Sequence, residues 1–496
     1  MHLGLILDMV HSGYAGRTAL TAGGTSIGYT DLAERSWGAS ARFTELDVPA
    51  VVYVGSNHAA FPVALFGAAG AGVPFIPLSY RLGTEQLAAR IEAHPGAFIV
   101  HADDLPIGTE GSRSSPLQPF LDSLARVGAD PPPAQDADLP CVLLYTSGTT
   151  AAPKAAVLRH RHLMSYLLGT VEFASADEDE VSLVSVPPYH IAGVANLLSN
   201  LYAGRRIIYL HRFDPEAWLD TVRRQSVTQA MVIPTMLARE VDHLQGADDS
   251  RTPSLRSLSY GGARMPTPVL RRAMELFRTT GFVNAYGLTE TSSTIALLGP
   301  DEHRAAFDSE DPAERARLGS VGRLLPGIEA EVRNDDGTPV PGGQSGLLHL
   351  RGEQISGEYA GGTLLDAEGW FSSRDRGRID EAGYLFIEGR ADDTIIRGGE
   401  NIAPAEIEDV LLSCEGIVDA AVVGLPDDEW GQRLVAAVVA GEGRSMSAEE
   451  LKGVVRDRLR SSKTPETIEF WPELPRTDTG KLLRRQVVAQ LTDDRP

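Results

Sequence analysis

Two kinds of segment alternate along the first half of the chain: short apolar, β-branched runs and longer stretches with apolar residues at helical spacing. The runs predict strands at residues 50–55, 97–101, 142–145, 206–209 and 230–233. The stretches between them predict helices at residues 85–93, 215–224 and 266–277. Strands that alternate with helices are typical of α/β proteins with largely parallel sheets, so we expect that fold class.

The pattern changes near residue 320. Residues 328–333, 346–351 and 383–389 alternate polar and apolar positions, as half-buried antiparallel strands do. Beyond residue 390, predicted helices at 404–414 and 447–460 mix with predicted strands at 418–423 and 434–440. We therefore expect a large domain at residues 1–390 and a small domain at residues 391–496.

Composition and charge indicate which partners and which cellular compartment to expect. The chain has 496 residues and a formal net charge of -22, which argues against nucleic acid or an anionic membrane as a partner. Cys141 and Cys414 are the only cysteines, and the first residues lack the basic start of a signal peptide, so we expect a cytoplasmic protein. Residues 48–80 carry no charge, but prolines and glycines interrupt them, and we expect strand, helix and strand there rather than a membrane span.

A run of small and hydroxylated residues follows the predicted strand 142–145 and ends at Lys154. Small residues let backbone N–H groups turn toward an anion, hydroxyl groups add donors, and a lysine adds a mobile positive charge. Only four of the 45 basic residues are lysines, so a lysine at this place indicates a need for a compact charge. The run predicts a phosphate-binding loop that consists of Thr146, Ser147, Gly148, Thr149, Thr150 and Lys154.

Residues 145–154 resemble the signature loop of the adenylate-forming enzymes, which include acyl-CoA synthetases, firefly luciferase and the adenylation domains of peptide synthetases. Further motifs follow in the order of this superfamily over nearly the whole chain. The resemblance implies a large domain of two α/β subdomains and a small β-barrel-like subdomain, followed by a small, mobile α+β domain. Ala151 and Ala155 stand where the superfamily pattern has glycine, and a Cβ at Ala151 restricts a loop that must wrap phosphates.

The resemblance implies a nucleotide site that several motifs share. Residues 259–263 match the turn beside adenine and the acyl group. Residues 284–290 match a motif whose carboxylate, Glu290, holds Mg²⁺ with Thr289 beside it. Asp375 and Arg390 match two contacts to ribose. The implied nucleotide contacts outside the phosphate loop are Gly261, Gly262, Ala263, Asn284, Ala285, Tyr286, Gly287, Asp375 and Arg390.

Three further motifs are implied to serve the small domain. Lys481, in the segment 475–481, matches the catalytic lysine whose charge offsets the negative charge that develops when a carboxylate attacks ATP. Asp392 matches the hinge about which the small domain turns. Gly398 and Gly399 match a turn that admits the thin arm of coenzyme A, and the segment around Trp430 is typical of members that use coenzyme A.

The acyl group is expected between residues 187–193 and the strands that follow. His190 matches a residue that gates this pocket, and we count it among the catalytic candidates. The side chains implied for the lining are mostly small, and none is an aspartate, glutamate or arginine, which favours a bulky, uncharged acid of aromatic, alicyclic or terpenoid-like type. This lining consists of His190, Ile191, Ala192, Met231, Gly262, Ala285, Gly287, Ser292 and Ser293.

The expected activity is that of an ATP-dependent carboxylate–CoA ligase. It would form an acyl-adenylate, release pyrophosphate and pass the acyl group to coenzyme A, with ATP, Mg²⁺ and coenzyme A as cofactors. Ala151 and Ala155 leave open a ligase that only transfers a preformed acyl-adenylate to coenzyme A. A non-catalytic sensor of acyl groups or nucleotides and a luciferase-like monooxygenase are alternatives of other classes. The expected partners are the carboxylic acid, ATP and coenzyme A. The sequence leaves open whether the protein forms a homodimer.

Overall fold

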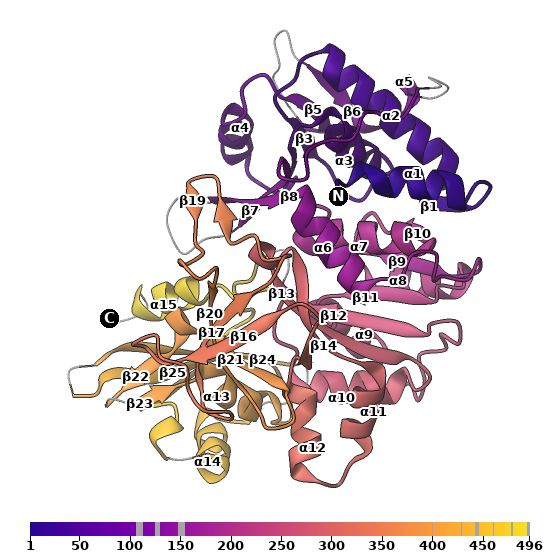
Figure 1. Cartoon of the computed structure of the whole chain (residues 1–496). Helices are drawn as coiled ribbons and strands as arrows, with labels where there is room; N and C mark the ends of the chain where they lie inside the picture. The colour runs from indigo at the N-terminus through magenta and orange to yellow at the C-terminus, as the bar shows by residue number, and fades with distance from the viewer. Residues whose placement is uncertain are drawn as a thin grey trace.

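The computed structural model describes residues 1–105, 113–124, 129–146, 154–398, 400–427, 429–441, 446–459, 461–477 and 480–493, without the side chains of Asn401 and Asp493. Figure 1 shows two large sheets with helices on their faces, a smaller sheet below them, and the last hundred residues beside that smaller sheet. The fold is therefore a mixed α/β arrangement with a large amino-terminal part and a small carboxyl-terminal part, as the sequence predicts.

The first large sheet has eight strands in the order β19-β18-β8-β7-β4-β3-β5-β6. Its strands are β3 (Val51–Val54), β4 (Phe75–Leu78), β5 (Phe98–His101), β6 (Ser114–Pro116), β7 (Pro140–Thr146), β8 (Lys154–Arg159), β18 (Glu358–Tyr359) and β19 (Gly362–Thr363). The β3, β4, β5, β6 and β7 strands pair in parallel, whereas β8, β18 and β19 run antiparallel to their neighbours. Its helices are α1 (Gly4–Gly13), α2 (Tyr29–Glu45), α3 (Ala60–Ala71), α4 (Thr84–Glu92) and α5 (Leu117–Ser123).

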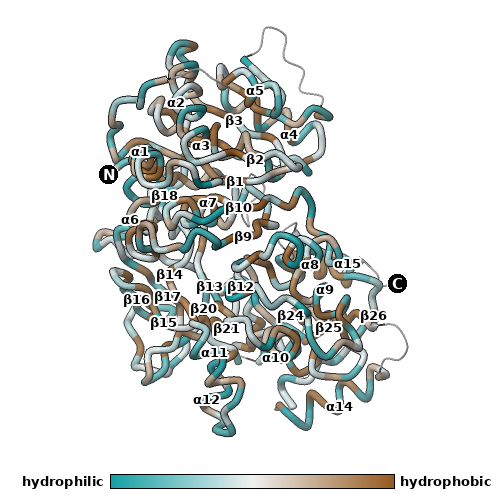
Figure 2. The backbone as a smooth tube through the Cα atoms, turned by 90° about the vertical axis from the view of Figure 1, so that its right-hand side faces the viewer, coloured by the Kyte–Doolittle hydropathy of each residue, from teal (hydrophilic) through white to brown (hydrophobic). Residues whose placement is uncertain are grey.

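The uncharged stretch 48–80 forms β3, α3 and β4, as predicted, and it is almost completely buried. Small residues allow α2 and α3 to pack closely, since a Cβ at Gly67 would lie 2.6 Å from the Cβ of Ala39. In Figure 2 the hydrophobic colour gathers inside the molecule around α3 and β3. No helix in the described parts of the chain is long and apolar enough to cross a membrane.

The second large sheet has nine strands in the order β15-β14-β13-β12-β11-β9-β10-β1-β2. Its strands are β1 (Thr18–Ala22), β2 (Thr25–Gly28), β9 (Val181–Val184), β10 (Arg206–Tyr209), β11 (Gln229–Val232), β12 (Ser257–Gly261), β13 (Gly281–Leu288), β14 (Ser293–Leu298) and β15 (Arg323–Leu324). The centre of this sheet is parallel and its two ends are antiparallel. The associated helices are α6 (His160–Thr170), α7 (Ile191–Ala203), α8 (Pro215–Arg224), α9 (Pro234–His243), α10 (Thr267–Leu276), α11 (Pro300–Asp308), α12 (Pro312–Ala316) and the 3₁₀ turns η1 (Thr289–Thr291) and η2 (Arg317–Gly319).

The third unit, expected as a β-barrel-like subdomain, is a four-stranded antiparallel sheet in the order β16-β17-β20-β21. Its strands are β16 (Glu329–Arg333), β17 (Gly346–Arg351), β20 (Phe371–Ile379) and β21 (Leu385–Arg390). Between β17 and β20 the chain returns to the first sheet, where Tyr359 of β18 pairs with Ala156 of β8. This return places residues 354–363 beside the strands that flank the predicted phosphate loop.

The last unit contains β22 (Ile395–Arg397), β23 (Glu400–Ile402), α13 (Pro404–Leu412), β24 (Ile417–Asp427), β25 (Gly431–Ala440), α14 (Ala448–Arg458), η4 (Ser461–Lys463), β26 (Thr467–Phe470) and α15 (Arg484–Asp493), preceded by the turn η3 (Ala391–Asp393). The β24 and β25 strands extend beyond the ranges 418–423 and 434–440, because they pair as one hairpin as far as Asp427 and Gly431. Among the buried apolar clusters, two consist only of residues from this last unit. Three others consist only of residues that precede residue 390. We keep the boundary at residues 390/391 as our proposal.

Candidate functional site

Asp375 lies at the centre of a buried polar group formed by three strands. The Tyr286 hydroxyl of β13 donates to Asp375 Oδ2 at 2.5 Å, and Arg390 Nη1 of β21 donates to Oδ1 at 2.8 Å. The neighbouring strands set this geometry, because Asp375 and Arg390 are register partners in β20 and β21. Burial, together with the Asp375 charge, raises the pKa of Tyr286 well above its usual value, so the phenol stays protonated and remains a donor.

Glu290 lies in η1, directly after β13, and the segment before β18 holds it. The backbone amides of Ser356 and Gly357 donate to the Glu290 carbonyl at 2.8 and 3.2 Å. The Tyr359 hydroxyl donates to Glu290 Oε1 and lies 3.4 Å from the Thr146 hydroxyl at the end of β7. Through Tyr359 the turn that carries Glu290 is therefore connected to the strand that leads into the predicted phosphate loop.

Lys481 reaches this region from the small domain. The turn that carries it lies against the start of α9, since a Cβ at Gly480 would lie 2.6 Å from Thr235 Oγ1. Although water reaches the Lys481 side chain, surrounding protein lowers its pKa; Arg390 also lowers it, and the carboxylates Asp375, Asp393 and Glu290 raise it. The structure thus brings Lys481 within electrostatic reach of Asp375 and Glu290, two carboxylates of the large domain.

The turn η3 contains Asp392, and an arginine from β20 contacts it. Arg374 Nη1 lies 3.6 Å from Asp392 Oδ2. Arg374 has a φ of +60°, a left-handed conformation that glycine adopts more easily. From α15, Arg484 donates to both oxygens of Glu408 at 2.6 and 2.9 Å and lies 3.4 Å from Asp393 Oδ2.

Two of the glycines predicted near the ligand are required by the sheet itself. A Cβ at Gly261 would lie 2.3 Å from the Ala285 carbonyl, and a Cβ at Gly287 would lie 1.9 Å from the Ser293 carbonyl. Ser292 and Ser293 have φ values of +54° and +115°, and Ser292 is fully buried. These residues therefore shape the tight connection between β13 and β14 that presents Glu290.

The other predicted nucleotide contacts lie at the ends of neighbouring strands. Gly262 and Ala263 follow β12, and Gly262 has a φ of +81°. Asn284 on β13 is held by a hydrogen bond from its side-chain amide to the Ser320 carbonyl at 3.1 Å. Thr289 begins η1 beside Glu290. The parallel pairing of β12 with β13 places these residues at one edge of the sheet.

The predicted acyl residues lie on α7 and β11. His190 is the half-buried residue that precedes α7, and its ring centroid lies 4.6 Å from that of Tyr189. Ile191 and Ala192, in the first turn of α7, are half-buried as well. Met231 on β11 lies beside α7, with its sulfur 3.9 Å from the side-chain nitrogen of Asn196.

Some residues predicted for the phosphate loop and for coenzyme A are not found beside Asp375 and Glu290. Lys154 begins β8 opposite Thr146 of β7, but Ser147, Gly148, Thr149, Thr150 and Ala151 lie outside the described residues, as does Gly399. Gly398 and Trp430 lie together at the β22–β23 hairpin, where the Gly398 amide donates to the Trp430 carbonyl at 2.8 Å. Figure 1 shows this hairpin at the outer edge of the small domain, away from β13. The hairpin therefore lies away from β13, the strand that leads to Glu290 (Figure 1).

The residues present fit the manner in which proteins bind Mg²⁺ beside a nucleotide. Among the described residues no group of three or more His, Cys, Asp or Glu side chains could hold a metal ion by itself. Mg²⁺ is usually held by one or two carboxylates together with substrate phosphates and water. Glu290, fixed by Tyr359, is suited to be such a carboxylate.

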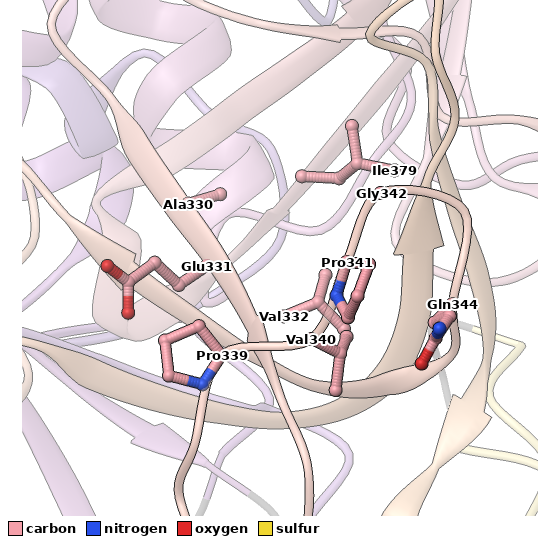
Figure 3. A pocket seen from close by; sticks show the side chains of 9 residues that line it. All are labelled: Ala330, Glu331, Val332, Pro339, Val340, Pro341, Gly342, Gln344 and Ile379. Atoms are coloured by element: carbon pink, nitrogen blue, oxygen red, sulfur yellow. The ribbon is translucent and has the colours of Figure 1, made fainter.

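A shallow pocket of about 200 Å³ lies elsewhere, on the four-stranded sheet. Figure 3 shows its apolar side chains, including Val332 and Val340, and Glu331 pointing away from them. The Glu331 carboxylate pairs instead with Arg333 at 2.9 Å. Besides Glu331, the lining has one polar side chain, the uncharged Gln344, and no cation for a phosphate, so we assign the pocket no function.

Tyr359, Arg374 and Arg264 escape prediction from the sequence. Tyr359 and Arg264 stand outside the residues that the motifs single out, and the partner of Arg264, Asp409, is 145 positions away. Arg374 directly precedes the motif residue Asp375, but no local pattern indicates its contact with Asp392.

Comparisons with known proteins identify the family to which the chain belongs. Residues 8–360 match the family of AMP-binding enzymes, and residues 406–481 match the C-terminal domain of AMP-binding enzymes. The chain is 33% identical over 488 residues to a feruloyl-CoA synthase of Amycolatopsis sp., covering 95% of each chain. It is 31% identical over 468 residues to an indoleacetate–CoA ligase of Aromatoleum aromaticum, covering 89% of each.

Solved structures show the same fold over the full length. An o-succinylbenzoate CoA synthetase of Bacillus subtilis in complex with its acyl-adenylate intermediate superposes with a TM-score of 0.83, at 25% identity and 97% coverage of both chains. An ATP-bound chimera, RpMatB-BxBclM chimera B1, gives a TM-score of 0.87 at 26% identity and covers 100% of both chains. The chain therefore belongs to the AMP-binding enzymes, and it is a ligase of the adenylate-forming, acyl-CoA synthetase type.

Proposed function

We propose that this enzyme joins a bulky, largely apolar carboxylic acid to coenzyme A through an acyl-adenylate, with conversion of ATP to AMP and pyrophosphate. One observation carries the proposal: the turn that carries Lys481 packs against Thr235 of the large domain and brings the lysine within electrostatic reach of Asp375 and Glu290. Two cations, Lys481 and Arg390, share this space with Asp375 and Glu290, and an anionic ligand would offset the repulsion between the two cations. A nucleotide with its ribose at Asp375 and its phosphates at Lys481 suits these charges, and Glu290 would hold the Mg²⁺ that accompanies the phosphates.

In the first half-reaction a carboxylate oxygen attacks the α-phosphorus of ATP, and the bond to pyrophosphate breaks. Asp375 accepts hydrogen bonds from the ribose hydroxyls while Tyr286 and Arg390 hold it in place. Lys481 stabilises the negative charge that develops on the phosphate oxygens, an effect worth about 3 kcal/mol or more. Bound Mg²⁺ would neutralise phosphate charge, with Glu290 as its protein ligand.

In the second half-reaction the thiol of coenzyme A attacks the acyl carbonyl, a new carbon–sulfur bond forms, and AMP leaves. We propose that the small domain turns about Asp392 for this step and brings the Gly398 turn to the acyl group. Two features support the turn: η3 connects the two parts of the chain, and the Gly398 hairpin lies away from the site in the present arrangement. One mobile domain then serves both steps.

The acid is proposed to be aromatic. The side chains on α7 and β11 near Met231 are uncharged, and the charged residues described above belong to the nucleotide region. Two relatives at 33% and 31% identity are named for feruloyl and indoleacetate, which are both aromatic acyl groups. The half-buried ring of His190, next to the first turn of α7 and packed against the buried Tyr189, provides a flat surface against which an aromatic acid can stack.

Purified enzyme should be tested with a panel of acids, each with and without coenzyme A, for pyrophosphate, AMP and thioester. Ferulate and indole-3-acetate represent the aromatic class, cyclohexanecarboxylate the alicyclic class and a medium-chain fatty acid the linear class. We expect pyrophosphate without coenzyme A, thioester with it, and a preference for an aromatic acid. Loss of about a hundredfold or more in pyrophosphate formation is expected for Lys481→Ala. An unchanged rate in that variant would contradict the proposal.

A ligase that only transfers a preformed acyl-adenylate is the second candidate, because alanine replaces glycine at Ala151 and Ala155. Ala155 is accommodated without disturbance: it pairs with Tyr145 in the regular β7–β8 register, and its carbonyl accepts the Ala360 amide at 3.0 Å. This favours the complete reaction. Robust pyrophosphate release in the absence of coenzyme A would exclude the transfer-only ligase, and any turnover would exclude a silent sensor.

A further inference from the structure

Tyr359 has no place in the motifs of the chain, and yet its hydroxyl joins two parts of the candidate site. It donates to Glu290 Oε1 and lies 3.4 Å from Thr146 Oγ1. The two partners come from η1 and β7, which belong to different sheets. A single half-buried phenol therefore connects the turn that carries Glu290 with the strand that enters the phosphate loop.

The backbone around Tyr359 is fixed from several directions. Arg159 of β8 forms a two-point ion pair with Glu358, with Nε–Oε2 at 2.9 Å and Nη2–Oε1 at 2.7 Å. Tyr359 itself pairs with Ala156 in the ladder between β18 and β8. Because the neighbouring residue and the strand pairing already hold the segment, the Tyr359 hydroxyl is not needed to keep β18 in place.

One carboxylate oxygen of Glu290 accepts a hydrogen bond from the Tyr359 hydroxyl. Among the residues that the structure describes, Tyr359 is the hydrogen-bond donor to the Glu290 side chain, and it contacts Oε1. No hydrogen bond from the described residues engages Oε2, so this oxygen is available to another ligand. Mg²⁺ demands nearly ideal octahedral geometry, so a carboxylate that ligates it gains from a fixed orientation, and carboxylate ligands are themselves usually hydrogen-bonded.

We propose that Tyr359 is a positioning residue for the Glu290 carboxylate: it orients Glu290 toward Mg²⁺ bound with ATP and couples it to Thr146 of the phosphate loop. This inference rests on the proposed function, because it takes Glu290 as the metal ligand. Tyr359 acts through Glu290 and does not itself touch the metal. Its effect is therefore confined to the half-reaction that uses ATP.

The test compares Tyr359→Phe with Tyr384→Phe. Tyr384 also donates to a glutamate, Glu302, at 2.9 Å, but on a different part of the molecule, so the control loses the same kind of hydrogen bond. For Tyr359→Phe we expect pyrophosphate formation to fall about tenfold and the Mg²⁺ concentration for half-maximal rate to rise about tenfold. Thioester formation from a preformed acyl-adenylate and coenzyme A should be unchanged, and Tyr384→Phe should match the wild type in each assay.

A binding measurement gives a readout that does not depend on turnover. Mn²⁺ replaces Mg²⁺ and is titrated into enzyme saturated with a non-hydrolysable ATP analogue, with detection by electron paramagnetic resonance. Tyr359→Phe should weaken Mn²⁺ binding about tenfold, and in the Glu290→Gln background the same substitution should have no further effect. Unaltered Mn²⁺ binding in Tyr359→Phe would overturn the inference, as would an equal additional loss in the Glu290→Gln background.

The same experiments separate this inference from the proposed function. If Lys481→Ala abolishes pyrophosphate formation while Tyr359→Phe keeps wild-type metal dependence, the proposed function stands and the role of Tyr359 fails. If the wild type forms no pyrophosphate with any acid, and the Mn²⁺ titration shows no binding that depends on Glu290, both fail together.

Discussion

Arg264 and Asp409 form an ion pair that joins the large domain to the small one. Arg264 follows β12, and Asp409 lies on α13, so the pair can form only while α13 faces the end of that strand. Burial raises the pKa of Asp409, and Arg264 partly offsets the rise. The pair therefore belongs to the domain arrangement in which the Lys481 turn packs against Thr235 and Lys481 is within electrostatic reach of Asp375 and Glu290.

Asp409→Asn should slow the formation of acyl-adenylate about two- to fivefold, because a partly exposed ion pair contributes roughly 0–1 kcal/mol. The transfer of a preformed adenylate to coenzyme A should not slow, since that step is proposed to use another domain arrangement. Pyrophosphate and thioester assays measure the two steps separately. Asp457→Asn, at an exposed site on α14, is the control. An equal loss in both steps would show that the substitution acts on stability and not on domain arrangement.

Gly480→Ala should reduce adenylate formation about tenfold through two separate penalties. Gly480 has a φ of +75°, and a Cβ there would lie 2.6 Å from Thr235 Oγ1. Thr235→Ala removes the clash but leaves the backbone strain, so the double variant should recover part of the rate. Pyrophosphate release measures both. No recovery in the double variant would mean that the turn does not contact α9 during catalysis.

Adenylate formation should decline as the pH rises through the lowered pKa of Lys481. Surrounding protein, with Arg390, moves this pKa below its ordinary value of 10.5, and only the protonated amine carries the charge that the reaction needs. The pH dependence of pyrophosphate release should therefore show a basic limb with a midpoint below 10.5. Whatever activity Lys481→Arg retains should show no such basic limb, because the guanidinium group stays protonated over the whole pH range of the assay. A limb that persists in the arginine variant would assign it to another group.

Glu240→Gln should stabilise the protein at neutral pH. Glu240 on α9 is fully buried, its two oxygens have no hydrogen-bond partner among the described residues, and burial raises its pKa from 4.5 to about 9. Between these values the folded state keeps a proton that the unfolded state releases, so the free energy of unfolding falls as the pH rises. The variant has no such proton and should gain roughly 1–3 kcal/mol at about pH 7.

Urea unfolding at about pH 5 and about pH 8 measures this gain, which should grow with pH. Glu216→Gln, at an exposed position on α8, should show no gain at either pH. A constant difference between Glu240→Gln and the wild type would mean that Glu240 is ionised in the folded protein.

Local patterns predicted the elements well and the contacts between them poorly. The helix expected at 215–224 is α8 with the same bounds, and the strand expected at 346–351 is β17, because burial on one face imposes a period that the sequence displays. The ends of β24 and β25 differ from the prediction, since hairpin pairing carries them past the apolar core. Pairing with a partner strand is not visible in the residues of one strand alone.

The sequence by itself determined the α/β class, the order of the elements and the identity of the motif residues, including Lys154, Glu290, Asp375 and Lys481, because side-chain chemistry and short-range periodicity are local properties. Only the tertiary structure decided which of these residues meet. It brought Lys481 within electrostatic reach of Glu290, paired Arg264 with Asp409 across 145 positions, and set Tyr359 against Glu290 across 69. Such contacts depend on how whole sheets and domains pack, and no local stretch of sequence records the packing of a distant one.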